Sequence, residues 1–319
     1  GARRLLVIYG DRDPGDVIHK MNTRKDKYDI SGKVHIREGE EKIHAMMEDY
    51  EGVIIWDLPS QIRNRYLKYC FSHSIRCYMS PKISDIILLG TDRIHLFDTP
   101  LLMCRNQGLS MEQRAAKRVL DIIVSGLGII VSSPIMLIIA IAVKAYDGGP
   151  VFYLQDRLTY QGKEFRIRKF RSMCVDSEKN GARLASKHDS RITPVGHVLR
   201  NLHLDELPQL FNVFMGDMSL VGPRPERDVI MQEYEQEIPE FHYRLKVKAG
   251  LTGYAQVYGK YNTTPYDKLK LDLFYIENYS FLLDIKLLFM TVKIFFQKEV
   301  SEGVDDNQKN ALKDSEDKK

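Results

Sequence analysis

The sequence predicts two folded parts: an α/β Rossmann-like domain over residues 1–108 and a mainly helical α+β, membrane-associated domain over residues 109–300. Three observations predict this division. Strand-like and helix-like runs alternate through the first hundred residues, a long apolar run follows, and basic and leucine-rich blocks come after it. A chain of 319 residues is long enough for two ordinary domains. The net charge of +4 is too small to indicate a nucleic-acid partner.

The N-terminal part has the βαβ rhythm of a small parallel sheet covered by helices. The apolar runs RLLVIYG, GVIIWDL and IRCYMSP alternate with helix-like stretches near residues 15–24, 38–50 and 60–73. The first strand ends in YGDRDPGD, without the GxGxxG that brings backbone amides to a pyrophosphate. We therefore expect this domain to be structural or regulatory.

The apolar run at 119–143 is a candidate membrane segment. Its 25 residues carry a single charge, Asp121, and suffice to cross a bilayer core of roughly 30 Å. Pro134 lies past the middle and removes a backbone donor, which kinks or breaks a helix. Ser132 and Ser133 offer hydroxyl groups to the carbonyl groups that such a break leaves unpaired.

Two arrangements of this segment compete. Basic residues flank both of its ends, which favours both ends on the cytoplasmic face, so that a helix-break-helix around Ser133 and Pro134 re-enters the same leaflet. The alternatives are a kinked helix that spans the bilayer and a buried helix of a soluble core. In each case we expect the helix to begin near Ser110.

A strongly basic strand is predicted after this segment. The stretch GGPVFYLQDRLTYQGKEFRIRKFRSM reads as a hairpin with Gly162 at its turn. Its second arm carries five cations within nine residues: Lys163, Arg166, Arg168, Lys169 and Arg171. Such a local field attracts an anion, either lipid headgroups or a phosphate-bearing ligand.

The stretch LRNLHLDELPQL places two acids, Asp205 and Glu206, in a frame of leucines. Pro208 predicts a helix that starts close to them, so helix capping is one interpretation of the pair. Arg200 precedes the pair, and Arg224 is held between two prolines in GPRP. A constrained arginine suits a phosphate clamp, because its paired donors match phosphate oxygens.

These blocks carry a family resemblance. The broken apolar helix, RIRKFRSM, LRNLHLDELPQLFNVFMGDMSLVGPRP, GLTGYAQV and LDLFYIENYSFLLDIKLLFMTV follow in the order typical of monotopic bacterial phosphoglycosyl transferases, over roughly residues 110–300. Those enzymes start polysaccharide assembly by moving a sugar-1-phosphate from a UDP-sugar to undecaprenyl phosphate. The resemblance implies a bacterial inner-membrane enzyme with its catalytic domain on the cytoplasmic face, and long members suggest a homodimer.

The resemblance also implies roles for individual residues. Asp205 corresponds to the nucleophile that attacks the β-phosphate of the donor and releases UMP, and Asp205 and Glu206 together are expected to hold Mg²⁺. Undecaprenyl phosphate then attacks the phosphosugar-aspartyl enzyme. Lys169, Arg200 and Arg224 correspond to phosphate-binding residues, and Arg171 lies in the same basic run and is expected to assist them.

Some expectations stay open at this point. The family usually has proline where this chain has Ala249 in AGLTG, which loosens that turn. Residues 277–297 are helical and apolar, either at the membrane interface or in the core, and residues 301–319 read as a disordered tail. The transferred sugar is not identified. The competing hypothesis is a catalytically idle, membrane-anchored scaffold whose soluble domain binds a partner or a nucleotide.

Overall fold

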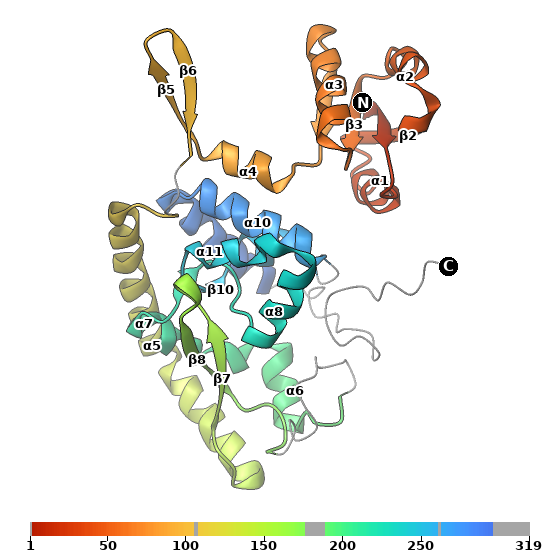
Figure 1. The fold of residues 1–319 in the computed structure, drawn as a ribbon. Helices are drawn as coiled ribbons and strands as arrows, with labels where there is room; N and C mark the ends of the chain where they lie inside the picture. Colours follow the sequence, from red (N-terminus) through yellow and green to blue (C-terminus); the bar gives the residue numbers. More distant parts are fainter. Residues whose placement is uncertain (1, 105–107, 176–188, 261–262, 296–319) are drawn as a thin grey trace. The chain divides into compact units, whose positions relative to one another are not determined.

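The computed structural model describes residues 2–104, 108–175, 189–260 and 263–295 (Figure 1). The chain forms two compact units that divide between Asp85 and Ile86. This division falls before the predicted boundary near residue 108, because Gly90 already lies directly against Glu277 of the second unit. The predicted tail at 301–319 lies outside the described residues.

The first unit is a four-stranded parallel sheet in the order β2-β1-β3-β4. Its elements are β1 (Arg3–Tyr9), α1 (Gly15–Asn22), β2 (Tyr28–His35), η1 (Ile36–Glu38), α2 (Glu40–Met47), β3 (Gly52–Trp56), α3 (Ser60–Ser72) and β4 (Arg76–Met79). On one face of the sheet, Leu6 and Ile8 pack against α2 and α3. On the other face, Leu5 and Val7 pack with residues of α1. The predicted βαβ rhythm is confirmed.

Strand β2 is the element of this sheet that the sequence reasoning missed. Its buried residues, Ile30 and Val34, are separated by Gly32, so the alternation of apolar and polar residues is short and interrupted. Gly32 is required by packing, since a Cβ there would lie 2.0 Å from the hydroxyl oxygen of Tyr50. A glycine demanded by a neighbouring side chain therefore weakened the strand signal.

In the second unit, short helices and paired strands pack along one side of one long helix (Figure 1). Helix α4 (Ile83–Leu89) crosses the division between the units. It is followed by β5 (Asp92–Leu96), β6 (Thr99–Met103), α5 (Met111–Asp147), β7 (Phe152–Leu158), η2 (Tyr160–Gly162), β8 (Glu164–Phe170), α6 (Pro194–Asn201), η3 (Leu204–Glu206), α7 (Gln209–Met215), β9 (Ser219–Val221), α8 (Asp228–Glu237), η4 (Pro239–Lys246), β10 (Gly250–Thr252), α9 (Tyr254–Tyr258), α10 (Pro265–Glu277) and α11 (Phe281–Phe295). The predicted hairpin is confirmed as β7 paired antiparallel with β8, whereas the β5–β6 hairpin was not predicted.

Helix α5 begins as predicted and continues through its proline. The Ser110 side chain accepts a hydrogen bond from the Gln113 amide in a capping box. Pro134 has no N–H for the Ile130 carbonyl, and the Ser133 hydroxyl donates to that carbonyl at 2.8 Å. The predicted break is thus replaced by one continuous helix, because a serine satisfies the carbonyl that proline leaves unpaired. That the segment re-enters one leaflet stays a prediction.

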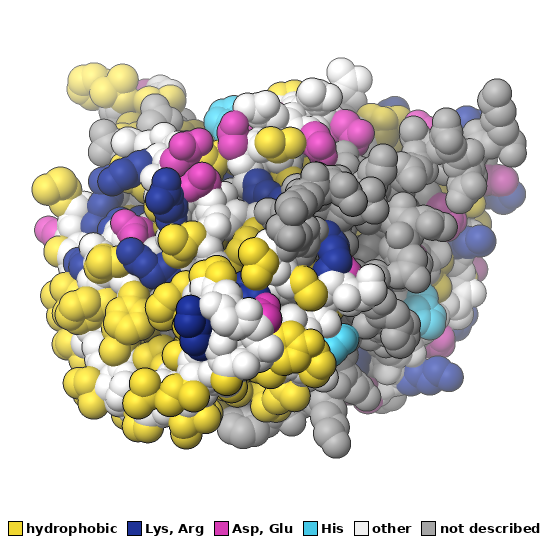
Figure 2. All heavy atoms as spheres, turned by 90° about the horizontal axis from the view of Figure 1, so that it is seen from below, with side chains coloured by type: hydrophobic (Ala, Val, Ile, Leu, Met, Phe, Trp, Pro, Cys, Tyr) yellow, Lys and Arg dark blue, Asp and Glu magenta, His cyan; other side chains and the backbone are white. Residues whose placement is uncertain are grey.

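The apolar face of α5 is mostly exposed. Among the described residues, α5 is the helix with the length and hydropathy to cross a membrane, and 17% of its most apolar 18-residue stretch is buried. This low burial is inconsistent with a core helix of a soluble protein. Exposed apolar residues recur along it: Val119, Ile122, Ile123, Leu127, Ile130, Val131, Leu137, Ile138 and Ile141. Figure 2 shows hydrophobic side chains gathered over a broad part of one face, bordered by lysine and arginine.

Candidate active site

Asp205 and Glu206 lie on a tight 3₁₀ turn. Strictly helical backbone begins only at Gln209 in α7, and no side chain caps either element. His203, before the turn, is in the left-handed region with φ 54°. The interpretation of Asp205 as a helix cap was therefore wrong, because successive i→i+3 turns and Pro208 carry the chain from α6 into α7.

The leucines around the two acids pack against helix α5. One apolar cluster joins buried Met136, Ile139, Val143, Phe170 and Leu199 to partly buried Leu204 and Leu207. Leu204 and Leu207 flank the acidic pair in sequence, and the α5 residues follow Pro134. The pair is therefore fixed beside the second half of the apolar helix.

Glu206 shares one carboxylate oxygen between two cations. Lys169 on β8 donates to its Oε1 at 2.7 Å, and Arg224 donates to the same atom at 3.1 Å. Burial opposes ionisation of Glu206, but the charges of Arg224 and Lys169 outweigh burial and lower its pKa well below the usual value. Two of the predicted phosphate-binding residues are thus brought to the acidic pair, where they hold Glu206 ionised.

Asp205 is in a contrasting environment. Among the described residues, none donates a hydrogen bond to its half-buried carboxylate. Burial raises the pKa of Asp205, and the Glu206 charge adds to this, whereas the charges of Lys169 and Arg200 oppose it. Arg200 lies close enough to Asp205 for its charge to favour the ionised carboxylate, and a phosphate-binding role for Arg200 stays a prediction.

The Arg224 loop is held by closely packed glycines. The Gly222 amide donates to the Thr252 carbonyl at 2.8 Å, and the Gly250 amide donates to the Pro223 carbonyl at 2.9 Å. A Cβ on Gly250 would lie 2.0 Å from the Gly222 nitrogen. Strands β9 and β10, parallel neighbours, therefore approach too closely for side chains and fix the start of the loop.

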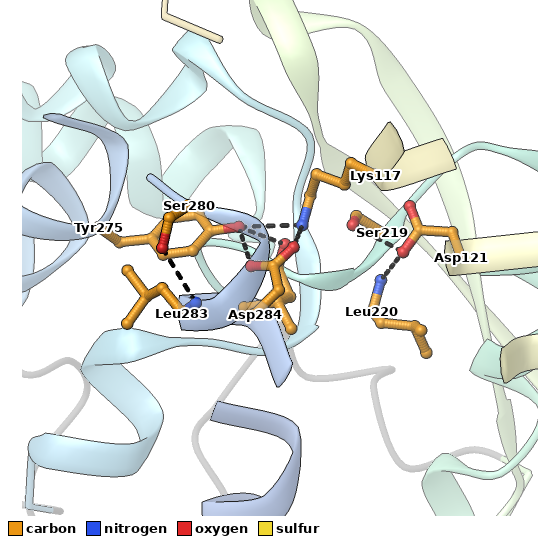
Figure 3. Close-up of polar contacts among 9 residues, drawn as sticks. Lys117, Asp121, Ser219, Leu220, Tyr275, Ser280, Leu283 and Asp284 are labelled. Carbon is orange, nitrogen blue, oxygen red and sulfur yellow. Dashed lines mark hydrogen bonds and ion pairs between the residues drawn. The ribbon is translucent and has the colours of Figure 1, made fainter. Parts of the chain in front are cut away.

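A buried polar network anchors β9 to the membrane helix (Figure 3). The Asp121 carboxylate on α5 accepts hydrogen bonds from the Ser219 hydroxyl at 3.0 Å and the Leu220 amide at 2.9 Å. Four residues before Asp121, Lys117 donates to Asp284 on α11 at 2.5 Å. Because β9 leads directly into the Arg224 loop, this network connects α5 to the position of the arginine.

Asp121 and Arg157 are residues that the sequence reasoning did not assign to the site. Asp121 is the single charge of the apolar run, and this feature of the sequence could have identified it. Arg157 on β7 donates to the Pro225 carbonyl at 3.3 Å, and burial lowers the pKa of Arg157 to about 10, so it stays charged at neutral pH. No sequence spacing connects it to the Arg224 loop.

Arg171 has partners other than the acidic pair. Its guanidinium forms a two-pronged ion pair with Asp147 at the end of α5, and its Nε donates to the Pro150 carbonyl at 2.7 Å. These contacts fix the turn between α5 and β7. The structure therefore does not bring Arg171 to Asp205 or Glu206, and a phosphate-binding role for it stays a prediction.

The donor atoms of the pair suit Mg²⁺ if a ligand completes the coordination. Within the described ranges, no group of three or more His, Cys, Asp or Glu side chains converges as a metal cage. Among the described residues, no donor contacts either carboxylate oxygen of Asp205 or the Oε2 of Glu206. Mg²⁺ in proteins is commonly held by one or two carboxylates together with substrate phosphates and water.

The backbone N–H of Ala249, which a proline would lack, forms a hydrogen bond. Its buried amide donates to the Thr159 hydroxyl at 3.0 Å, and its carbonyl accepts from the Ser219 amide at 2.8 Å. The departure from the family's usual proline therefore adds a hydrogen bond between this turn and the residue after β7. The expected loosening of the turn is offset by this contact.

A sequence model described as bacterial sugar transferase matches residues 112–298. The chain is 44% identical over 232 residues to a UDP-N-acetylgalactosamine-undecaprenyl-phosphate N-acetylgalactosaminephosphotransferase of Aeromonas hydrophila, covering 72% of this chain and 54% of the relative. It is 40% identical over 298 residues to a UDP-glucose:undecaprenyl-phosphate glucose-1-phosphate transferase of Escherichia coli K12, covering 90% of this chain and 61% of the relative.

A similar relationship holds for a UDP-glucose:undecaprenyl-phosphate glucose-1-phosphate transferase of Klebsiella pneumoniae, with 38% identity over 262 residues, 79% of this chain and 54% of the relative. The chain thus spans somewhat more than half the length of these relatives. The matched region contains the acidic pair, its cations and the apolar helix.

Proposed function

Because the chain belongs to the bacterial sugar transferase family, we propose that it transfers a sugar-1-phosphate from a UDP-sugar to undecaprenyl phosphate at the cytoplasmic face of the inner membrane. The observation that carries this proposal is the unequal pair on η3. Asp205 accepts no hydrogen bond from the described residues, whereas the adjacent Glu206 is held by Lys169 and Arg224. Such a transfer would initiate assembly of a cell-surface polysaccharide.

The reaction divides into two successive displacements at the β-phosphorus of the donor. An oxygen of Asp205 attacks the β-phosphorus of the donor, the bond from that phosphorus to the bridging oxygen breaks, and UMP departs with the bond's electron pair. A phosphate oxygen of undecaprenyl phosphate then attacks the same phosphorus. The bond to Asp205 breaks, which restores the carboxylate and forms the polyprenyl diphosphosugar.

The surrounding cations make the first displacement feasible. A carboxylate that approaches a diphosphate meets like charge, so positive groups must neutralise the phosphates before attack. Lys169, Arg200 and Arg224 supply that charge. Asp205 and Glu206 would hold Mg²⁺, which would supply further neutralisation of the diphosphate.

The apolar face of α5 explains how a lipid acceptor reaches the same residue. Leu204 and Leu207 beside the pair pack on α5, whose outward side chains are exposed and apolar. A covalent enzyme separates the reaction in time, so the soluble donor and the lipid acceptor need not occupy the site together. This favours an enzyme over an idle scaffold.

A panel of UDP-sugars tests the proposal and identifies the sugar. The full chain is incubated with Mg²⁺, undecaprenyl phosphate and UDP-glucose, UDP-galactose or their N-acetylated forms, and UMP and lipid-linked product are quantified. We expect turnover with one class of sugar and a loss of about 10³-fold or more in Asp205→Asn. Arg166→Gln, at an exposed cation of β8, the strand that carries Lys169, is the control. Equal turnover by Asp205→Asn and wild type would exclude Asp205 as the nucleophile.

A further inference from the structure

A second basic site lies away from the acidic pair. A cavity of about 340 Å³ opens between the start of α5, Tyr160, Ser219 and residues 246–248. A buried water needs only about 10–15 Å³ by a comparable measure, so this volume has room for a polyatomic ion and several waters. Two of its cations, Arg118 and Lys248, contact the carboxyl end of α7, whereas Asp205 precedes the amino end of that helix.

The residues that line the cavity are unequally charged. Five are basic and one is acidic: Arg114, Lys117, Arg118, Lys246 and Lys248 against Asp121. The Asp121 carboxylate is engaged by Ser219 and Leu220, and Lys117 is matched by Asp284. The residues that line the cavity therefore carry a net positive charge, and Asp217 and Glu277 lie close enough to act on Lys248 and Lys246.

Three of these cations keep donors available. Arg118 donates to the Val213 and Phe214 carbonyls at 2.8 and 2.7 Å, and Lys248 donates to the Gly216 carbonyl at 2.7 Å. Lys246 lies over a tyrosine ring. An arginine carries five N–H donors and a lysine three, so neither Arg118 nor Lys248 is saturated.

The electrostatics favour an anion in this cavity. Burial lowers the pKa of Lys248, and the neighbouring charge of Arg118 lowers it further, against the influence of Asp121 and Asp217. A bound anion would relieve the repulsion between Arg118 and Lys248.

The cavity lies where α5 changes from basic to apolar. Its α5 residues end at Asp121, and the exposed apolar face begins at Val119 and continues through Ile122. When the apolar face is in hydrocarbon, the preceding turn is at the depth of phosphate headgroups, where basic pockets bind anionic lipid.

We propose that this cavity binds a phosphate group, carried by an anionic phospholipid headgroup or free in solution, at a site separate from the acidic pair. Arg118 and Lys248 hold the phosphate at the end of α7, and Lys246, which also lines the cavity, adds a third positive charge. Because binding is measured without turnover, the proposal does not depend on the reaction proposed above.

Thermal unfolding of the full chain tests this site. The unfolding midpoint is measured in neutral detergent with added phosphatidylglycerol, with phosphatidylcholine, and with inorganic phosphate against chloride at equal ionic strength. We expect phosphatidylglycerol or phosphate to raise the midpoint, and Lys246→Gln to weaken the apparent affinity about tenfold, as loss of one hydrogen bond to a charged group does. Lys144→Gln removes an exposed lysine at the opposite end of the same apolar run and is the matched control.

The arms of this experiment distinguish the source of the phosphate. Stabilisation by phosphatidylglycerol alone identifies a lipid headgroup, and stabilisation by inorganic phosphate that is weakened in Lys246→Gln identifies a soluble phosphate. The proposal is overturned if neither additive raises the midpoint of the wild type. It is also overturned if Lys246→Gln responds like the wild type, because the phosphate is then bound elsewhere, or if Lys144→Gln loses the response equally, because the effect is then general surface charge.

Discussion

Two lysine–carboxylate clusters in the second unit have similar chemistry, but they differ in how completely the protein hydrogen-bonds their carboxylate oxygens. Lys117 and Asp284 meet at 2.5 Å with 8% and 1% of their side chains exposed, and Tyr275 donates to the second oxygen of Asp284 at 2.7 Å. Lys169 and Glu206 meet at 2.7 Å with 19% and 20% exposed, and Asp205 beside them has no hydrogen-bond donor among the described residues. The first cluster is saturated by the protein, whereas the second leaves oxygen atoms for a ligand.

This difference indicates that the first cluster stabilises the fold, whereas the second is suited to binding a ligand. A saturated buried network holds elements together, as Lys117 and Asp284 join α5 to α11 (Figure 3). A half-buried carboxylate without donors stabilises nothing by itself, since burial alone disfavours its charge. A ligand that supplied the missing partners would offset this cost.

The largest effect is expected from breaking the saturated cluster. Asp284→Leu leaves the Lys117 ammonium buried and unpaired, so we expect the free energy of unfolding to fall by about 3–5 kcal/mol. The double variant Asp284→Leu with Lys117→Met should recover most of that loss, because two apolar groups replace the pair. Chemical denaturation in detergent measures both, with Asp205→Asn as the comparison, which should not be destabilised. A double variant as unstable as the single one would contradict the role of the pair.

Arg224→Lys tests the second cluster, which contains Lys169, Glu206 and Asp205 and is called the open cluster. Lysine keeps the charge near Glu206 but loses the paired donors that match phosphate oxygens. We expect kcat/KM for the UDP-sugar to fall about tenfold, equivalent to about 1.4 kcal/mol, with little change in the unfolding midpoint. Arg166→Lys, on an exposed arginine of β8, should retain full activity. If both variants behaved alike, the position of Arg224 would have no bearing on the donor.

The two adjacent acids are expected to give stability opposite dependences on pH. The folded pKa of Asp205 is raised above 3.8, so its contribution to stability is present below that pH and is lost as pH rises through the folded value. The folded pKa of Glu206 is lowered below 4.5, so its contribution is present above that pH and is lost as pH falls through the folded value.

Unfolding midpoints from acid to neutral pH test these signs. Relative to wild type, Asp205→Asn should become more stable as pH rises above 3.8, because it removes a charge that burial disfavours. Glu206→Gln should lose its disadvantage as pH falls below 4.5, because the ion pairs with Lys169 and Arg224 are then also lost in the wild type. Parallel curves for the three proteins would show that the two environments do not differ.

The sequence predicted those features that depend on local pattern. The helices α1, α2 and α3, the β7–β8 hairpin and the start of α5 at Ser110 follow from periodicity, turn glycines and a capping box. These features are encoded by residues close together in the chain.

The features that depend on distant partners could not be predicted. Arg171 and Lys169 are two residues apart in one basic run, and only the fold sends one to Asp147 and the other to Glu206. Pro208 is compatible both with the 3₁₀ turn that contains Asp205 and with an α-helix that starts at Asp205, so the sequence could not distinguish them. A local pattern therefore located the site but could not assign each cation to its partner.

The smallest effect is expected at Ala249, and it tests how rigidly β9 and β10 support the open cluster. Ala249→Pro removes the amide that donates to the Thr159 hydroxyl at 3.0 Å, a hydrogen bond with a net value of about 1 kcal/mol. Proline also restricts the unfolded chain, which returns about 0.4–1 kcal/mol where its φ is accommodated. The two terms nearly cancel, so we expect a change in unfolding free energy within about 1 kcal/mol and unchanged kcat/KM. Thr159→Val, which removes the acceptor and keeps the amide, should cost more than Ala249→Pro, because it leaves the buried Ala249 amide unpaired. A larger loss from the proline variant would mean that this hydrogen bond, rather than the glycine contacts at Gly222 and Gly250, fixes the start of the Arg224 loop.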